Sequence, residues 1–339
     1  MREVSSGFEA LARIFASLDL GFVEHVLSEA YRPEGSVGRP HRSLLGMFKA
    51  ELAKRLGGAQ SYRELHRLLQ TDEALRSLCE IKADEKPYDR STLTRFRRRV
   101  GPERLERIMA SVVRQLDRMN VLDCGVLALD ATFIEAYSRR DPEDNSCGLF
   151  DSEARLRKQG RNVVLGYGVH LAADAGSEMP LAVIVESANV NEKKIAIPLL
   201  RKVRKHRRRV RHVVADSQYS SEDFRYEIKR LGAEPVIPYP RNQRRGEKGV
   251  LRVDKKFRSH GPWRLKRLYR CRSVIERVAA RLTDHFGLEQ VRTRGLRNIL
   301  THTLLCLIAM LIIALSAHLL GYPDLMRSPV SLMNLTGRI

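Results

Sequence analysis

The order of the hydrophobic patterns restricts the fold more than any other feature of this sequence. The first 120 residues show helical periodicity without convincing strand alternation, whereas from residue 122 the apolar residues form short runs rich in Val and Ile. We expect strands over 125–138, 163–174, 180–190, 211–218 and 234–240, and helices over 191–206 and 220–232. Two close hairpins followed by alternation of helix and strand predict a mixed sheet with helices on its faces, preceded by a small all-α domain.

The N-terminal part contains one strongly basic helix. Helical patterns cover 43–56 and 61–81, and Ser61 stands three residues before a glutamate, which is the spacing of a capping box. Ser91 can cap the next helix, and a further helix follows over 102–120. The basic helix carries Arg95, Arg97, Arg98 and Arg99. A short arginine run fits a DNA-binding module of the helix-turn-helix type and a simple scaffold equally well, so both interpretations stay open.

One segment near the C-terminus is apolar enough to suggest a membrane span. Residues 299–322 contain no Asp, Glu, Lys or Arg, but the unbroken apolar part, 304–315, is only twelve residues long. A bilayer span needs about twenty. We therefore expect a core helix over 299–320 that covers the sheet, and no membrane partner. A membrane-associated basic protein is the remotest alternative.

The charge of the chain indicates a nucleic acid partner. Lys and Arg number 61 against 40 Asp and Glu, a formal net charge of +21, and residues 201–275 alone hold 24 basic and 7 acidic side chains. So dense a segment fits a face that binds a polyanion better than an ordinary solvated surface, on which both signs are interspersed. Within it, 241–262 is a basic excursion from the fold, with Arg244, Arg245 and Lys248 as predicted DNA contacts.

Cysteine and histidine usage argues against a disulfide framework or a zinc site. The five cysteines are odd in number, widely spaced and without a C-x-x-C pair, which is typical of reduced thiols in an intracellular protein. Histidines show no H-x-x-x-H spacing. The N-terminus also lacks the apolar run of a signal peptide.

Three acidic residues stand where two strands and a helix can bring them together. Asp130 ends the apolar run VLALD, Asp216 ends HVVAD, and Glu276 lies on a helix that we expect over 263–285. A carboxylate at the end of a buried strand is costly to desolvate unless a cation binds it, and such oxygen ligands suit hard divalent cations. Two such ions can activate water or a 3′-hydroxyl and stabilise the leaving oxygen of a phosphodiester.

Each of these acids also has a purely structural interpretation. A strand-end Asp is commonly a turn or cap residue, and Glu276 can pair with Arg272 or Arg277 on its own helix. Glu135 and Asp174 lie on neighbouring strand runs and remain alternatives, although Asp174 precedes Ala-Gly-Ser and suits a turn. The order strand Asp, strand Asp, helix Glu within a basic α/β domain favours the metal interpretation.

These segments resemble the DDE transposases of bacterial and archaeal insertion sequences, whose catalytic domain is related to ribonuclease H. The resemblance lies in LALDATFIEA, VVADSQYSSEDF and YRCRSVIERVAARLTDHFGLEQVRTRG, and in N-terminal segments such as SYRELHRLLQTDEALRSLCEI. Tyr269, Arg272 and Glu276 fit the signature Y-x2-R-x3-E-x6-K of one large branch. The terminal Lys position is Thr283, a departure for which nearby arginines are the alternative basic residues, Arg277 and Arg281.

The resemblance implies a fold, an activity and partners. The fold is α/β, with a ribonuclease H-like mixed sheet flanked by helices over 121–325, an all-α domain over 1–120 and a tail over 326–339. The activity is divalent-metal-dependent cleavage of DNA at terminal inverted repeats and transfer of the 3′-OH ends into target DNA. We expect a homodimer on the paired DNA ends and a cytoplasmic, nucleoid-associated location. The alternative, which Thr283 keeps open, is an inactive remnant that still binds element ends.

The same resemblance implies the site residues. Asp130, Asp216 and Glu276 are expected to hold two Mg²⁺ or Mn²⁺ ions. The expected DNA contacts are Tyr269, Arg272, Arg244, Arg245, Lys248, Arg95, Arg98 and Arg99. Trp263, the only Trp, can stack on an unpaired base near the cleaved end or pack in the core, and both interpretations stay open.

Overall fold

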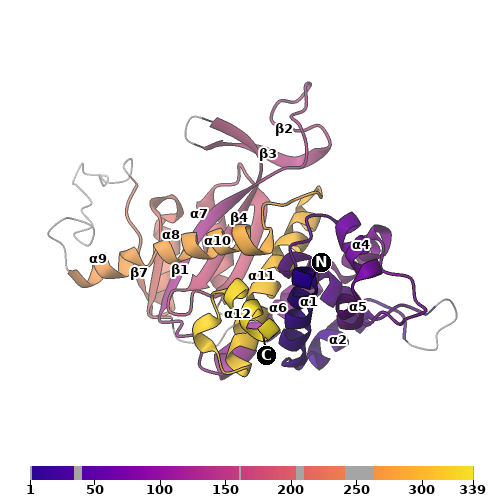
Figure 1. Cartoon of the computed structure of the whole chain (residues 1–339). Helices are drawn as coiled ribbons and strands as arrows, with labels where there is room; N and C mark the ends of the chain where they lie inside the picture. Colours follow the sequence, from indigo (N-terminus) through magenta and orange to yellow (C-terminus); the bar gives the residue numbers. More distant parts are fainter. Residues whose placement is uncertain (1, 34–39, 160–161, 204–209, 241–262, 339) are drawn as a thin grey trace, which may run out of the picture. The chain divides into compact units, whose positions relative to one another are not determined.

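The chain forms two compact units. The computed structural model describes residues 2–33, 40–159, 162–203, 210–240 and 263–338 (Figure 1). The helical unit comprises Met1–Gln115, Leu282–Gln290 and Arg297–Ile339, and the sheet unit comprises Leu116–Arg281 and Val291–Leu296. This division follows contacts within the chain. The boundaries 1–120, 121–325 and 326–339 expected from the sequence stay a prediction.

A seven-stranded mixed sheet forms the centre of the sheet unit. Its strands are β1 (Val126–Glu135), β2 (Cys147–Gly148), β3 (Asp151–Gln159), β4 (Asn162–Asp174), β5 (Pro180–Ser187), β6 (His212–Ala215) and β7 (Glu234–Val236). β4 is antiparallel to both β1 and β5, whereas β6 runs parallel to β1 and β7 parallel to β6. The expected mixed sheet is therefore confirmed.

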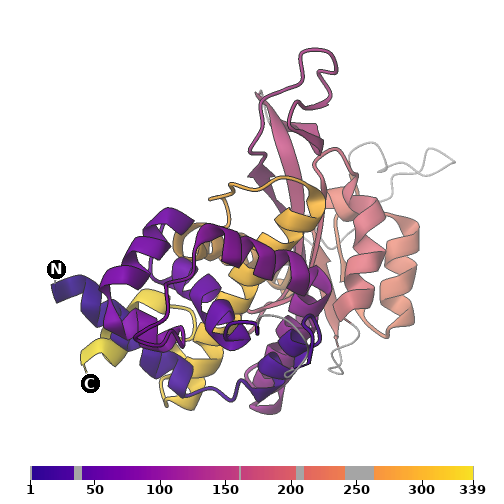
Figure 2. The same cartoon turned by 90° about the vertical axis from the view of Figure 1, so that its right-hand side faces the viewer.

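Helices cover both faces of this sheet. The helices α7 (Glu192–Val203) and α8 (Glu222–Arg230) lie on one face, and α10 (Ser273–Phe286) crosses the other (Figures 1 and 2). The strands between them are apolar on both sides, as a sheet covered on both faces requires: Leu127 and Ala128 of β1, and Val213 and Val214 of β6, point to opposite faces and are all fully buried. The expected α/β class, with helices flanking a mixed sheet, is confirmed.

One pair of strands was not expected from the sequence. The sequence predicts no strand between 138 and 163, but this segment contains β2 and β3. β3 pairs with the first residues of β4, from Arg155↔Gly166 to Gln159↔Asn162, while β5 pairs with the remainder of β4. β2, β3 and the start of β4 form an arm that extends beyond the rest of the sheet (Figure 1). The sequence of β3, DSEARLRKQ, contains no apolar run, and most of its described side chains are exposed or half-buried.

The long helix expected over 263–285 is two helices. α9 (Trp263–Arg270) ends in a turn, and α10 begins at Ser273. The turn contains Arg272. The expected continuous helix is therefore wrong at this point, and the break lies at a residue of the candidate site.

The helical unit contains α1 (Arg2–Ala16), α2 (Gly21–Ser28), α3 (Leu44–Leu56), α4 (Tyr62–Thr71), α5 (Glu73–Leu78), α6 (Arg90–Arg118), α11 (Leu296–Leu319) and α12 (Pro329–Arg338). Ser61 caps α4 as predicted, since its hydroxyl accepts the N–H of Glu64. The predicted cap of α6 is wrong: Asp89, not Ser91, accepts the N–H of Thr92 at 2.6 Å. Within α6 the backbone leaves helical geometry at Gly101 (φ 67°), a left-handed conformation that glycine tolerates.

The apolar helix α11 is buried inside the protein. By length and composition it could cross a membrane, with a mean hydropathy of 2.4 in its most apolar window, but 89% of that window is buried. The Ser316 hydroxyl donates to the carbonyl of Ile14 in α1. Burial in a helical core explains a helix that is apolar on all sides. Its contacts assign most of it, from Arg297 onward, to the helical unit, whereas the sequence suggested that it covers the sheet.

Candidate active site

Two of the predicted acids lie side by side on neighbouring strands. β1 and β6 run parallel, and Leu129 is the register partner of Ala215. Asp130 and Asp216 are the next residue along each strand, so the roughly 4.8 Å spacing of adjacent strands separates their backbones. β1 continues to Glu135, but its pairing with β6 ends at Leu129. Both carboxylates therefore lie at the carboxyl end of the parallel part of the sheet.

Asp130 is held in a mostly buried position. One carboxylate oxygen accepts the backbone N–H of Ala131 at 2.8 Å, and the other pairs with Arg272 at 3.0 Å. The pKa of Asp130 is raised to about 6, mainly because of burial; the negative charges of Asp216 and Glu276 contribute to the rise, while the Ala131 N–H and Arg272 oppose it. Asp216 and Glu276 thus lie near enough for their charges to act on Asp130.

Asp216 closes β6 and begins a short 3-10 turn (Ser217–Tyr219). Its carboxylate accepts the N–H groups of Gln218 at 2.9 Å and Tyr219 at 3.4 Å, which is the cap role that a strand-end Asp commonly takes. Burial nevertheless raises the pKa of Asp216, and the charge of Glu192 adds to the rise. The cap fixes the carboxylate in place, and the second oxygen remains available for a ligand in addition to this structural role.

Glu276 reaches the same place from the first turn of α10. Its side chain is 54% exposed and pairs with Arg272 at 2.5 Å. A cavity of about 120 Å³ lies between α10 and the sheet. Its lining residues are Asp130, Ala131, Thr132, Leu171, Ile275, Glu276 and Ala279. Asp130 and Glu276 thus face one small cavity that has an apolar wall.

Arg272 connects the acids of the site. One nitrogen contacts Asp130 at 3.0 Å and another contacts Glu276 at 2.5 Å. Across the described residues, no group of three or more His, Cys, Asp or Glu side chains is arranged closely enough to hold a metal ion. The Arg272 guanidinium lies between Asp130 and Glu276 and supplies the positive charge that neutralises them. If it moves aside, the oxygen atoms of these carboxylates are the type of ligand that a hard divalent cation takes.

Tyr269 belongs to the same neighbourhood. Its half-buried ring packs against Val214 of β6 and Val236 of β7. Burial raises the pKa of its hydroxyl, and the negative charges of the three acids add to the rise. The structure therefore brings Asp130, Asp216, Glu276, Tyr269 and Arg272 together, as the sequence predicted.

The sequence did not identify Glu178, which determines where the other arginines of α10 point. Glu178 lies in the turn between β4 and β5 and is nearly buried. It pairs with Arg277 at 2.6 Å and with Arg281 at 2.8 Å. The two alternative basic residues for the position of Thr283 are thus bound to a carboxylate outside the site. Only the folded turn brings Glu178 to α10, so no local signal could identify it.

A second group of polar contacts lies near Asp216, whose pKa the charge of Glu192 helps to raise. Glu192, at the start of α7, pairs with Arg157 of β3 at 2.6 Å. The Tyr219 hydroxyl lies 2.9 Å from Nδ1 of His170, whose pKa burial lowers to about 4. A neutral histidine can share a hydrogen bond with a tyrosine at no cost in buried charge. No local sequence pattern identifies these four residues, because they come from four separate elements.

The two alternative acids have other roles. Asp174 is fully buried and accepts the N–H groups of Cys124 and Ser177 at 2.9 Å each, so the turn interpretation is correct. Glu135 is exposed at the end of β1, five residues beyond Asp130. Neither belongs to the site.

The predicted basic surface of the helical unit is present on α6. Arg95, Arg98 and Arg99 are exposed, and the guanidinium of Arg99 lies 5.1 Å from the ring centre of Tyr31. Arg97 instead contacts Glu51, a fully buried carboxylate, at 3.3 Å. The structure thus separates one structural arginine from three that point to solvent.

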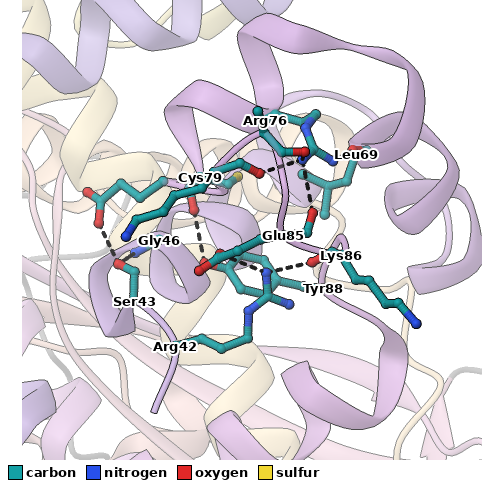
Figure 3. Close-up of polar contacts among 12 residues, drawn as sticks. Arg42, Ser43, Gly46, Leu69, Arg76, Cys79, Glu85, Lys86 and Tyr88 are labelled. Atoms are coloured by element: carbon teal, nitrogen blue, oxygen red, sulfur yellow. Dashed lines mark hydrogen bonds and ion pairs between the residues drawn. The ribbon is translucent and has the colours of Figure 1, made fainter. Parts of the chain in front are cut away.

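Further arginines of this unit have structural roles (Figure 3). Arg76 donates to the carbonyls of Lys82 and Glu85, and Arg42 donates to that of Lys86. The Tyr88 hydroxyl donates to the carbonyl of Cys79 at 3.0 Å. These bonds hold the connection that leads into α6, and thereby fix the start of the basic helix.

Some predicted contacts cannot be placed. Arg244, Arg245 and Lys248 lie outside the described residues, and the Trp263 side chain is likewise not described. Their expected contacts with DNA stay predictions.

Comparison with known families gives two matches. Residues 124–312 match the family described as "Transposase DDE domain", and residues 4–99 match "Transposase domain (DUF772)". The first match covers more than half of the chain and includes all three acids. No curated protein matches the chain.

Solved structures of transposases are distantly similar. A piggyBac transposase synaptic complex with hairpin DNA has 11% identity and a TM-score of 0.42, over 98% of this chain and 80% of that chain. A Mos1 transposase paired-end complex with left transposon end has 12% identity and a TM-score of 0.22, over 89% of this chain and 82% of that chain. Scores this low carry no argument about function.

Proposed function

This chain belongs to the family of transposases with a DDE domain, and from this premise we propose that it is a DNA-cleaving and DNA-joining enzyme. It cuts DNA strands at the terminal inverted repeats of a mobile element and transfers their 3′-OH ends into target DNA. Family membership supports the reaction class. The specific steps rest on the chemistry of the candidate site.

The convergence of Asp130, Asp216 and Glu276 on Arg272 is the observation that carries the proposal. Burial raises the pKa of Asp130, and the charges of Asp216 and Glu276 add to the rise, so a cation bound among these carboxylates would be favoured. Arg272 supplies one positive charge for Asp130 and Glu276. Divalent ions would supply more charge with oxygen ligands of the type present.

The chain's own residues bind and orient the reacting groups. Asp130 and Asp216, on adjacent strands, and Glu276, across the cavity, would hold two Mg²⁺ or Mn²⁺ ions. When bound, such ions activate the attacking oxygen and stabilise the leaving oxygen of a phosphodiester. Arg272, displaced from between the acids, has the fork geometry to bind a phosphate oxygen pair. Tyr269, on whose hydroxyl the charges of the three acids act, would donate a hydrogen bond to the DNA strand held at the site.

DNA is the proposed partner. The formal net charge of +21 favours a polyanion, and Arg95, Arg98 and Arg99 present cations to solvent on a helix whose start is fixed by hydrogen bonds. We further propose a homodimer on the paired DNA ends and a cytoplasmic location, both of which follow from the activity. Size measurement of the protein with and without end DNA tests the dimer.

Strand cleavage of labelled element-end DNA tests the proposal. We expect cleavage with Mg²⁺ or Mn²⁺, none with EDTA, and none by Asp130→Asn, Asp216→Asn or Glu276→Gln, because an amide keeps the shape but loses the charge that holds the ions. Glu135→Gln is the matched control, since Glu135 is exposed on the same strand as Asp130. It should cleave normally.

The outcomes separate the two functions that the family allows. Full cleavage by any one of the three site variants would remove that residue from the site. If the wild-type chain binds element ends but never cleaves them with either metal, the inactive remnant is correct. The loss of cleavage would then be traced to Thr283, which stands where the signature has a lysine. Its hydroxyl donates to the Glu289 carboxylate at 3.3 Å.

A further inference from the structure

Two exposed aromatic rings lie together at the base of the β2–β3 arm. Tyr137, just after β1, is 53% exposed, and Phe150, just before β3, is 55% exposed. Among the described residues, few large apolar side chains are so exposed. Burying such rings normally contributes to stability, so exposed neighbouring rings mark an interaction surface.

Arginine guanidinium groups lie over both rings. The Arg294 guanidinium lies 5.4 Å from the ring centre of Tyr137 and 5.0 Å from that of Phe150, and that of Arg139 lies 5.8 Å from Phe150. Arg139 and Arg294 are themselves exposed. Aromatic faces combined with cations are the chemistry that binds bases together with phosphates.

The acidic residues of the arm face other partners. Asp141 accepts the N–H of Glu143 at 2.9 Å, and Asp144 accepts that of Ser146 at 3.0 Å and pairs with Arg155. Asp151 and Glu153, at the start of β3, accept the N–H groups of Gly295 at 3.2 Å and Leu296 at 3.0 Å. The charged groups that lie over the two rings are the guanidinium groups of Arg139 and Arg294.

Hydrogen bonds hold the three segments of this surface in place. The Arg294 Nε donates to the carbonyl of Tyr137 at 3.0 Å, and the N–H of Phe150 donates to the Ser138 hydroxyl at 3.0 Å. The N–H of Gly295 donates to Asp151, which also accepts the Tyr167 hydroxyl. These bonds fix the main chain that carries the two rings before a ligand arrives, which lowers the entropy cost of binding.

We propose that Tyr137 and Phe150, with Arg139 and Arg294, form a stacking surface for unpaired bases of the bound DNA. This rests on the proposed function for the identity of the polymer, but not for the chemistry of cleavage. Tyr137 is seven residues beyond Asp130, so an extended chain places it at most about 23 Å away. At about 3.4 Å per nucleotide, the stacked base lies within about seven nucleotides of the phosphate at the acidic site.

The test measures binding of the full chain, in EDTA, to two DNAs of the same sequence. One is a blunt duplex, and the other carries a single-stranded 3′ extension with 2-aminopurine as a stacking reporter. The double variant Tyr137→Ala/Phe150→Ala should bind the extended DNA about 5- to 150-fold more weakly, which is the worth of one stacked base, and bind the blunt duplex as before. Wild-type protein should quench the 2-aminopurine fluorescence by stacking on the base, and the double variant should not.

Matched variants keep the result interpretable. Tyr226→Ala removes an aromatic ring that is 67% exposed on α8 and should change neither affinity. Tyr137→Phe retains the ring and should bind as the wild type does. Phe150→Leu keeps apolar bulk without an aromatic face, so it tests stacking even if the double variant folds poorly.

Three results would overturn the inference. Unchanged binding of the extended DNA by the double variant excludes a stacking role. Equal weakening with both DNAs indicates a backbone contact, and a loss of binding to anionic lipid vesicles instead indicates a membrane surface. These results leave the cleavage assay untouched. Conversely, cleavage without the three acids would overturn the proposed reaction without affecting the stacking measurement.

Discussion

Replacing Asp130 with asparagine should stabilise the metal-free protein, although it should abolish cleavage. The pKa of Asp130 rises from 3.8 to about 6 on folding, mainly because of burial. A rise of about two units corresponds to about 3 kcal/mol, since each unit is worth about 1.4 kcal/mol. This figure already contains the attraction of Arg272, because that attraction acts on the same pKa.

The sign follows from proton binding. The folded protein binds this proton more tightly than the unfolded chain, so the contribution of Asp130 to stability is full below about pH 4. It is lost as the pH rises through about 6. Asparagine resembles the protonated form at every pH. Asp130→Asn should therefore match the wild type near pH 4 and exceed it by up to about 3 kcal/mol at pH 8.

Urea denaturation in EDTA at a series of pH values measures this difference. Glu135→Gln, an exposed carboxylate on the same strand, is the control and should show no such pH-dependent gain. Added Mg²⁺ should stabilise the wild type, by about 2.7 kcal/mol at one hundred times its dissociation constant, and leave Asp130→Asn unchanged. An Asn variant that is less stable at pH 8, or a difference that is flat with pH, would refute the reasoning.

Three further changes test other parts of the protein. Leu311 is fully buried in α11, so Leu311→Asp places an unpaired charge in the core and should cost more than about 3 kcal/mol in thermal unfolding, whereas Leu311→Met should cost less than about 1.5 kcal/mol. Wild-type protein that sediments with membranes and resists high salt would instead support a membrane span. Glu51→Gln leaves two arginines without their buried counter-charge and should lower the free energy of unfolding by about 3–5 kcal/mol; a loss below about 1 kcal/mol would contradict this. Replacing Arg244, Arg245 and Lys248 with alanine should reduce the log-log salt dependence of DNA binding by about 0.9 per lost phosphate contact, on specific and random duplexes alike, and an unchanged slope would place these residues away from DNA.

Five of the strands and the two acids that follow β6 and lie within β1 could be predicted from the sequence. Apolar runs that are buried on both faces are visible as continuous runs, and Asp130 and Asp216 each follow one. Parallel pairing of β1 with β6 then makes these acids neighbours. The family signature, which supplied Tyr269, Arg272 and Glu276, is likewise a matter of local spacing.

Errors arose where local patterns carry little energy. β2 is two residues long and β3 contains only two apolar residues, so neither gives a hydrophobic signal, although backbone pairing of β2 with β3 and of β3 with β4 forms strands all the same. Ser91 and Asp89 are both acceptable caps by residue type, and only the backbone geometry selects Asp89. The end of α9 at Arg270 is also a backbone feature without a Gly or Pro to announce it.

Local patterns in the sequence thus predict the buried strands, most of the helices and the acids that follow two of the strands. Which charges meet depends on the packing of the folded chain. This packing placed Arg272 between Asp130 and Glu276, and it bound Arg277 to Glu178 from a distant turn. The reason is physical: hydrophobic periodicity is a local property of the chain, whereas the pairing energy of a charge depends on distances and burial that exist only after residues far apart in sequence have packed together.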